Sequence, residues 1–294
     1  MPSYSPGIER AKPLLGTRVA VRVHGLAPEE ARVAIDAAFA EIATVHALMS
    51  FHEIESDVSR LNRHAHLEPV TVDRRTYEVL EQAQTIAAAS DGAFDITVAP
   101  DLVARSLLPQ PDGTCVPDPT AIWRDIALLP NHRVYFRRPL WIDLGGIAKG
   151  YAVDRAVETL LAFSPTQACV NAGGDLRLLG CESERVQLRA DHHDPKAVPI
   201  VEICGGSLAS SSGRMAGRRL QGMEAGPHVD TLKGHRRSAH RFVCVMAPRC
   251  MDADALTKVV MARGACSRSL LLYFDAWAVL HDEEFGWREI AGRA

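Results

Sequence analysis

Residues 141–160 read WIDLGGIAKGYAVDRAVETL, an apolar segment that runs through a glycine pair directly into an amphipathic pattern. We expect a short buried strand at residues 141–144 and a helix after the glycines, because apolar residues recur there at helical spacing. The pair Gly145 and Gly146 lets the backbone approach a bulky ligand, and a helix N-terminus presents unpaired N–H groups with a partial positive charge. The segment matches neither GxGxxG nor the P-loop pattern, so a packing turn and a phosphate-binding turn both remain open.

Two charged side chains flank this glycine turn. Asp143 stands before the glycines and Lys149 after them. A carboxylate accepts hydrogen bonds from a hydroxyl or a ring N–H, and an ammonium pairs with an anion. Their position on either side of one turn favours an anionic ligand over a purely structural turn.

The rest of the chain mixes strand and helix patterns without strict alternation. We expect a short helical turn after Ser56 and longer helices at residues 28–52, 72–92 and 252–264. We expect strands at residues 17–25, 198–204, 207–212, 241–248 and 271–282, and a strand–turn–strand unit at residues 167–180. This order favours the α+β class, with mixed sheets and packed helices, over a doubly wound parallel sheet.

The composition of the chain excludes several classes of binding partner and site. The 33 basic and 36 acidic residues give a net charge of -3, which argues against nucleic-acid binding and against a polybasic membrane anchor. No segment approaches the ~20 apolar residues of a membrane span, and the N-terminus lacks a signal-peptide pattern. Seven cysteines without CxxC or Cys/His spacing indicate neither a disulfide framework nor a zinc site. We expect a cytoplasmic protein, or a periplasmic one if the sequence is truncated.

Three further segments and one histidine contain candidate ligand-binding, metal-binding or catalytic residues. Residues 91–100, DGAFDITVAP, are either a helix C-cap followed by a strand or part of a ligand site, and residues 170–177, VNAGGDLR, suit a β-turn. Asp254 and Thr257 are either cap and dipole groups or hard oxygen ligands on one helix face that suit Mg²⁺. His228, in GPHVD, has the neighbouring acid that a general base needs.

Taken in order, these segments resemble the ApbE family of FAD:protein FMN transferases. The matching series runs from about residue 13 to residue 265 and consists of LLGTRVAV, MSFHEIESDVSRLNRHA, DGAFDITVAP, IDLGGIAKGYAVDR, VNAGGDLR, SLASSSG, PHVD and ADALTKVVMARG. The resemblance implies an α+β, ApbE-like fold related to the T-fold, with two intimate lobes around a flavin cleft. We expect residues 1–12 to form a tail and residues 13–294 to form a single FAD-binding transferase domain.

The resemblance also implies an activity. Such an enzyme binds FAD with Mg²⁺, splits its pyrophosphate and joins FMN through a phosphoester to a threonine of a target flavoprotein. The family's positions, carried onto this sequence, place FAD contacts at Ala93, Phe94, Asp95, Asp143 and Lys149, with the flavin ring near Phe51 or His52. They place a metal on the main-chain carbonyl of Gly146 and on Asp254, beside which Thr257 is a third candidate ligand, and they make His228 the catalytic base.

The sequence departs from the family's pattern at two places. The threonine that usually stands four residues after the metal-binding aspartate is Lys258 here, and Thr257 comes one residue earlier. An ammonium at that position would supply part of the metal's charge, so we expect Mg²⁺ binding to be weaker or differently arranged. The usual His-Ile-x-Asp-Pro-x-Thr-Gly run appears as HVDTLKG, which is one residue shorter, lacks the proline and has no threonine directly before the glycine.

FMN transfer onto a protein threonine is the leading functional hypothesis. The alternatives are a Mg²⁺-dependent FAD pyrophosphatase, in which water replaces the threonine, and a protein that binds or delivers FAD. A nicotinamide dehydrogenase is disfavoured because the dinucleotide fingerprint is missing.

Overall fold

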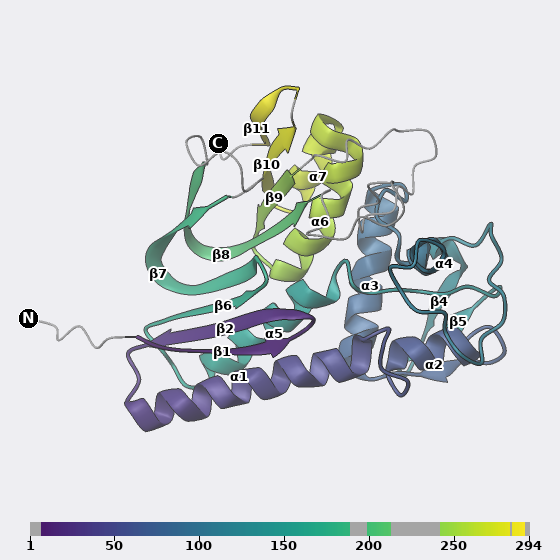
Figure 1. Ribbon diagram of the computed structural model, residues 1–294, viewed down its shortest axis with the longest axis horizontal. Coiled ribbons are helices and arrows are strands. Elements are labelled where there is room, and N and C mark those ends of the chain that lie inside the picture. The colour runs from purple at the N-terminus through teal and green to yellow at the C-terminus, as the bar shows by residue number, and fades with distance from the viewer. Residues whose placement is uncertain (1–6, 189–198, 213–241, 283, 292–294) are drawn as a thin grey trace, which may run out of the picture.

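The computed structural model describes residues 7–188, 199–212, 242–282 and 284–291 (Figure 1). Its helices are α1 (Pro28–Met49), α2 (Asp57–His64), α3 (Arg74–Ala89), α4 (Ala99–Ala104), α5 (Ala148–Leu161), α6 (Cys250–Arg263) and α7 (Arg268–Tyr273). Its strands are β1 (Ile8–Leu14), β2 (Thr17–His24), β3 (Val70–Thr71), β4 (Ile126–Leu129), β5 (Arg133–Phe136), β6 (Gln167–Ala172), β7 (Asp175–Gln187), β8 (Ile200–Ser212), β9 (Phe242–Ala247), β10 (Trp277–Asp282) and β11 (Gly286–Ile290). The α+β class expected from the sequence is confirmed, and the strand pairings within the described ranges are antiparallel.

Eight strands form the larger sheet, in the order β1-β2-β6-β7-β8-β9-β10-β11. The predicted unit at residues 167–180 is the β6–β7 hairpin, which turns at Gly173 and Gly174, both with positive φ. The prediction of two strands at residues 198–204 and 207–212 was wrong, because β8 is one strand that continues through Gly205 and Gly206. A glycine pair is a common turn signal, but here the two glycines lie beside an irregularity in the β7–β8 register.

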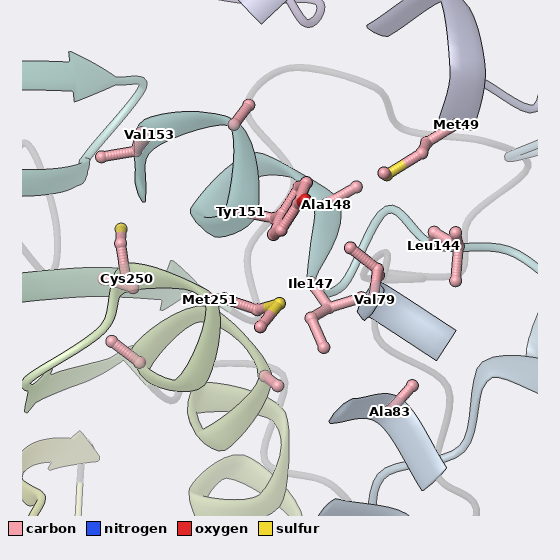
Figure 2. Packing of buried hydrophobic residues seen from close by; sticks show 14 of the residues in the cluster. Met49, Val79, Ala83, Leu144, Ile147, Ala148, Tyr151, Val153, Cys250 and Met251 are labelled. Atoms are coloured by element: carbon pink, nitrogen blue, oxygen red, sulfur yellow. The ribbon is translucent and has the colours of Figure 1, made fainter. Parts of the chain in front are cut away.

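Helices α1, α5 and α6 pack together against the larger sheet, with α5 in contact with both of the others. Figure 2 shows side chains from α3, α5 and α6 directed into one cluster, with Val79, Tyr151 and Met251 among them. Successive residues of β9 alternate between this core and a smaller apolar cluster on the opposite face of the sheet. The middle of the larger sheet is therefore buried on both faces.

A smaller three-stranded sheet, ordered β3-β5-β4, lies with α2 and α4 across α3 from the larger sheet (Figure 1). Ser56 caps α2 as predicted, and its hydroxyl accepts a hydrogen bond from the Ser59 N–H at 3.0 Å. The predicted strand at residues 271–282 was wrong in its first part, where α7 precedes β10. Within the described ranges, no helix has both the length and the apolar character that crossing a membrane requires.

The crossing of α5 and α6 depends on a glycine and an aspartate. A Cβ at Gly150 would overlap the carbonyl group of Cys250, whose carbon lies 2.6 Å from the ideal Cβ position. Asp154, one turn further along α5, accepts hydrogen bonds from the backbone N–H groups of Cys250 and Met251 at 2.9 Å each. It thereby caps α6, which has no side-chain cap of its own. Arg177 of β7 binds the same carboxylate at 2.7 Å and neutralises its charge.

Replacing Gly150 with alanine should destabilise the protein, although the same change in an open helix stabilises it by about 1 kcal/mol. The added methyl group forces α5 and α6 apart, so we expect a loss of about 1–3 kcal/mol in the free energy of unfolding, as for other overpacked sites. Gly146→Ala is the matched control, because its new Cβ would meet its nearest neighbours at 3.5 Å, an ordinary contact. Urea unfolding measures both, and equal stability of the two variants would contradict the argument.

Candidate active site

A cavity of about 630 Å³ lies between the end of α1, the segment after α3, the turn before α5, the end of β8 and α6. Its volume is within the range of small-molecule sites, about 300–1,000 Å³. The wall combines apolar side chains such as Phe94, Ile96 and Leu102 with the charged side chains of Asp143, Lys149 and Lys258. Such a wall suits a ligand that has both an apolar and an anionic part.

The backbone before the glycine turn is held by a side chain rather than by a sheet. The predicted strand at residues 141–144 was wrong, since no strand pairing is formed there. The Asn62 amide of α2 donates to the Ile142 carbonyl at 3.0 Å and accepts from the Ile142 N–H at 2.8 Å. The next N–H, that of Asp143, donates to the Ile96 carbonyl at 2.9 Å. A long-range amide contact thus takes the place of the strand partner.

The glycine turn brings the N-terminus of α5 to the cavity. The Gly145 N–H donates to Asp143 Oδ2 at 3.1 Å, and both glycines line the cavity. The N-cap residue Ile147 gives α5 no side-chain cap, and the first residues of the helix, Ala148 and Lys149, also line the cavity. The Ala148 N–H donates to the Leu144 carbonyl at 2.8 Å and the Gly150 N–H donates to Asp254 Oδ2 at 3.2 Å, so this helix end offers an anion in the cavity its partial positive charge rather than a set of unpaired N–H groups.

The segment after α3 is helical, whereas one of the two interpretations of residues 91–100 placed a strand there. A 3-10 helix at Ile96–Val98 leads into α4, and Asp95 caps it. One Asp95 oxygen accepts from the Thr97 N–H and hydroxyl, both at 2.8 Å, and the other accepts from the Trp123 N–H at 3.2 Å. The β-branched residues favoured a strand by propensity, but the capping contacts decide the conformation. Asp95 thereby holds this part of the cavity wall in place.

Two lysines and two aspartates form a group that we call the lysine–aspartate cluster. The Lys149 ammonium pairs with the carboxylate of Asp175, the first residue of β7. The Lys258 ammonium pairs with Asp254 Oδ1, one turn earlier in α6, and also donates to the Asp254 carbonyl at 3.0 Å. Asp254 Oδ2 accepts from the Gly150 N–H at 3.2 Å, whereas Asp175 Oδ1 is buried without a hydrogen-bond partner in the described part of the chain. The carboxylates are 0% and 1% exposed, so the lysines are their counter-charges.

Burial and neighbouring charge compete in this cluster. Burial, together with the nearby Asp254 charge, raises the pKa of Asp175 to about 6 against the opposing effect of the lysines. Burial acts in the same direction on Asp254, but Lys149 and Lys258 outweigh it and lower the pKa of Asp254. Burial opposes the charge of Lys149, but Asp254 and Asp175 outweigh it and raise the pKa of Lys149. Lys149 is therefore a permanent cation at the cavity wall.

Most of the sequence-predicted site residues meet at this cavity. Its lining includes Phe51, His52, Ala93, Phe94, Asp95, Asp143, Gly146 and Lys149. Thr257 does not reach it: the Thr257 hydroxyl donates to the Asp254 carbonyl at 2.7 Å and shares a hydrogen bond with Ser211 Oγ at 2.7 Å. His228, the predicted base, lies outside the described residues.

Sequence reasoning missed Asn62 and Asp175 as parts of the site. Asp175 directly follows the glycine pair of the β6–β7 turn, and an acid at such a turn was an available signal. Nothing local marks Asn62, because its partner Ile142 is 80 residues away along the chain.

Comparisons with known proteins point to one family. The model of the ApbE family matches residues 15–272. The FAD:protein FMN transferase of Treponema pallidum is 27% identical over 287 residues, covering 87% of this chain and 78% of the relative; that of Vibrio cholerae is 26% identical, covering 74% and 69%. The solved ApbE protein of Thermotoga maritima has a TM-score of 0.81 at 25% identity over 97% of each chain. The flavinyl transferase ApbE of Pseudomonas stutzeri has a TM-score of 0.78 at 22% identity, over 98% of this chain and 95% of that chain.

Asp175→Asn should remove a pH-dependent loss of stability. The raised pKa means that the folded state binds the Asp175 proton more tightly than the unfolded state does. The free energy of unfolding therefore falls as pH rises from the ordinary aspartate pKa of 3.8 to about 6. The free energy of unfolding of the variant, minus that of the wild type, should therefore increase by up to about 3 kcal/mol between pH ~4 and ~7. Urea unfolding across this range measures the difference. A difference that stays constant with pH would mean that Asp175 is ionised throughout.

Proposed function

The chain belongs to the ApbE family, and from this premise we propose that it is an FAD:protein FMN transferase that joins FMN to a threonine of a target flavoprotein. One observation carries the proposal: the residues that we expect to contact FAD come from separate segments but line a single cavity. The volume and mixed lining of this cavity suit a flavin nucleotide.

We assign the parts of FAD to the wall by chemistry. The Phe51 and Phe94 side chains supply apolar surface for the flavin ring. Asp95 and Asp143 supply acceptors for hydroxyl and ring N–H groups. Lys149 and the N-terminus of α5 supply positive charge for the pyrophosphate.

In the proposed reaction, the hydroxyl oxygen of the target threonine attacks the phosphorus of the FMN half of FAD. A phosphoester bond forms, the pyrophosphate P–O bond breaks, and AMP leaves with the electron pair. A base takes the hydroxyl proton, and His228 is our candidate for it. Ammonium and backbone N–H groups at the wall would stabilise the charge on the phosphate oxygens.

The Mg²⁺ that the family resemblance implies does not fit these residues well. Mg²⁺ prefers octahedral oxygen ligation from one or two carboxylates, waters and phosphates. The Asp254 oxygens are taken by Lys258 and by the Gly150 N–H, and the Thr257 hydroxyl binds Ser211 and the Asp254 carbonyl. Within the described ranges, no three His, Cys, Asp or Glu side chains gather closely enough to hold a metal ion.

Incubation with FAD and a candidate flavoprotein from the same genome tests the proposal. We expect a mass increase equal to FMN less one water on a threonine-containing peptide of the target, with one AMP released per label. FMN supplied in place of FAD should give no label, because only the pyrophosphate bond provides the leaving group. Mass spectrometry and nucleotide chromatography measure the two products.

The other outcomes identify the alternatives. Release of FMN and AMP without any target would indicate an FAD pyrophosphatase, and tight FAD binding without either product would indicate a delivery protein. Changing the labelled threonine to alanine is the matched control for the acceptor. Labelling that His228→Ala leaves undiminished would remove His228 from the role of base.

A further inference from the structure

The lysine–aspartate cluster lies where the α5 N-terminus and α6 border the cavity. Lys149 and Lys258 both line the cavity, and their carboxylate partners lie behind them in the core. The two ammonium and two carboxylate groups balance in charge, so the cluster is complete without an added cation. This balance distinguishes the wall from an open carboxylate site that would attract a metal ion.

Lys258 lies against both the glycine turn and Asp254. Its Cε is 3.5 Å from the ideal Cβ position of Gly146, and its ammonium contacts the Asp254 carboxylate and carbonyl. A cation that bridged the Gly146 carbonyl and Asp254 would need the space between these two residues. The Lys258 side chain contacts both residues and brings its own positive charge to this place.

The Lys258 ammonium can still bind a ligand. An ammonium has three N–H donors, and the two contacts to Asp254 use two of them. The side chain is 19% exposed at the cavity wall, whereas Asp254 is 1% exposed. A phosphate oxygen in the cavity would therefore meet the ammonium before the carboxylate.

We propose that Lys258 takes the place of a divalent cation, so that Lys149, Lys258 and the α5 N-terminus bind the FAD pyrophosphate without a metal. This inference rests on the proposed function, because it assigns FAD to the cavity. Lys258 is then a binding residue for the pyrophosphate. A divalent ion placed on Asp254 would instead meet the like charge of the Lys258 ammonium at contact distance.

Metal dependence of FAD binding tests the inference directly. With metal-free protein in chelator, titration of FAD by flavin fluorescence should give a dissociation constant that millimolar Mg²⁺ changes by less than about twofold. Sites that are coupled typically change each other's affinity about 5- to 150-fold. Because two coupled sites change each other's affinity by the same factor, FAD should not tighten the binding of Mn²⁺ either. Electron paramagnetic resonance measures Mn²⁺ binding independently of activity.

Substitution of Lys258 should create the metal dependence that the wild type lacks. Lys258→Thr removes the ammonium and leaves the Asp254 carboxylate open, so we expect FAD to bind at least about tenfold more weakly in chelator and to recover with Mg²⁺. Lys258→Met keeps the aliphatic stem without a ligand oxygen, and Lys258→Arg keeps the charge and should bind FAD without metal. Lys12→Met is the matched control, because Lys12 lies on β1 and pairs with the exposed Asp36.

The outcomes separate this inference from the proposed function. Wild-type binding that Mg²⁺ tightens about fivefold or more would overturn the inference and leave the transferase proposal intact. Absence of FAD binding with and without Mg²⁺ would overturn both. The wild-type titration needs no variant, so the test stands even if a substitution prevents folding.

Discussion

The close contact between α5 and α6 is the constraint on which the candidate site depends. Lys149 and Gly150 are neighbours in α5, and the Gly150 N–H reaches the carboxylate of Asp254 in α6. Because Gly150 has no side chain, the two helices approach closely enough for Lys149 and Lys258 to act on the same pair of carboxylates. Greater separation would take the Gly150 N–H and the Lys149 charge away from Asp254, and the Lys258 charge away from Asp175, so each buried carboxylate would keep only one counter-charge.

The lysine–aspartate cluster favours the binding of an anion more than it stabilises the fold. Removing paired charges from water costs about as much as their attraction returns, so the lysine–aspartate cluster contributes little net stability. The carboxylates instead hold two ammonium groups in fixed positions at the cavity wall. An anion that binds there does not have to order the lysine side chains, and this preorganisation favours binding.

The sequence predicted the elements whose signals are local. The helices at α1, α3, α5 and α6, the Ser56 cap and the β6–β7 hairpin each follow from spacing, capping or turn residues within a short window. The errors have two different causes. Asn62, 80 residues away along the chain, holds Ile142 in place of a strand partner. The helical turn after Asp95 depends on local capping contacts with Thr97, which outweigh the β-propensity of the segment, and the distant Trp123 N–H occupies the second Asp95 oxygen. The site residues came from the family resemblance, whereas the pairing of Lys149 with Asp175, 26 residues further along the chain, required the packing of α5 against β7.

Helix geometry explains why Thr257 cannot stand in for a residue at position 258. Successive residues of an α-helix are rotated by about 100°, while residues four apart lie on the same face. Lys258 therefore reaches back to the carboxylate of Asp254 and lines the cavity, whereas Thr257 is turned toward Ser211 at the end of β8 and is fully buried. Moving a hydroxyl by one residue removes it from the cavity instead of shifting it along the wall. The group at position 258 therefore decides which charge this part of α6 presents to the cavity, and in this chain that group is an ammonium.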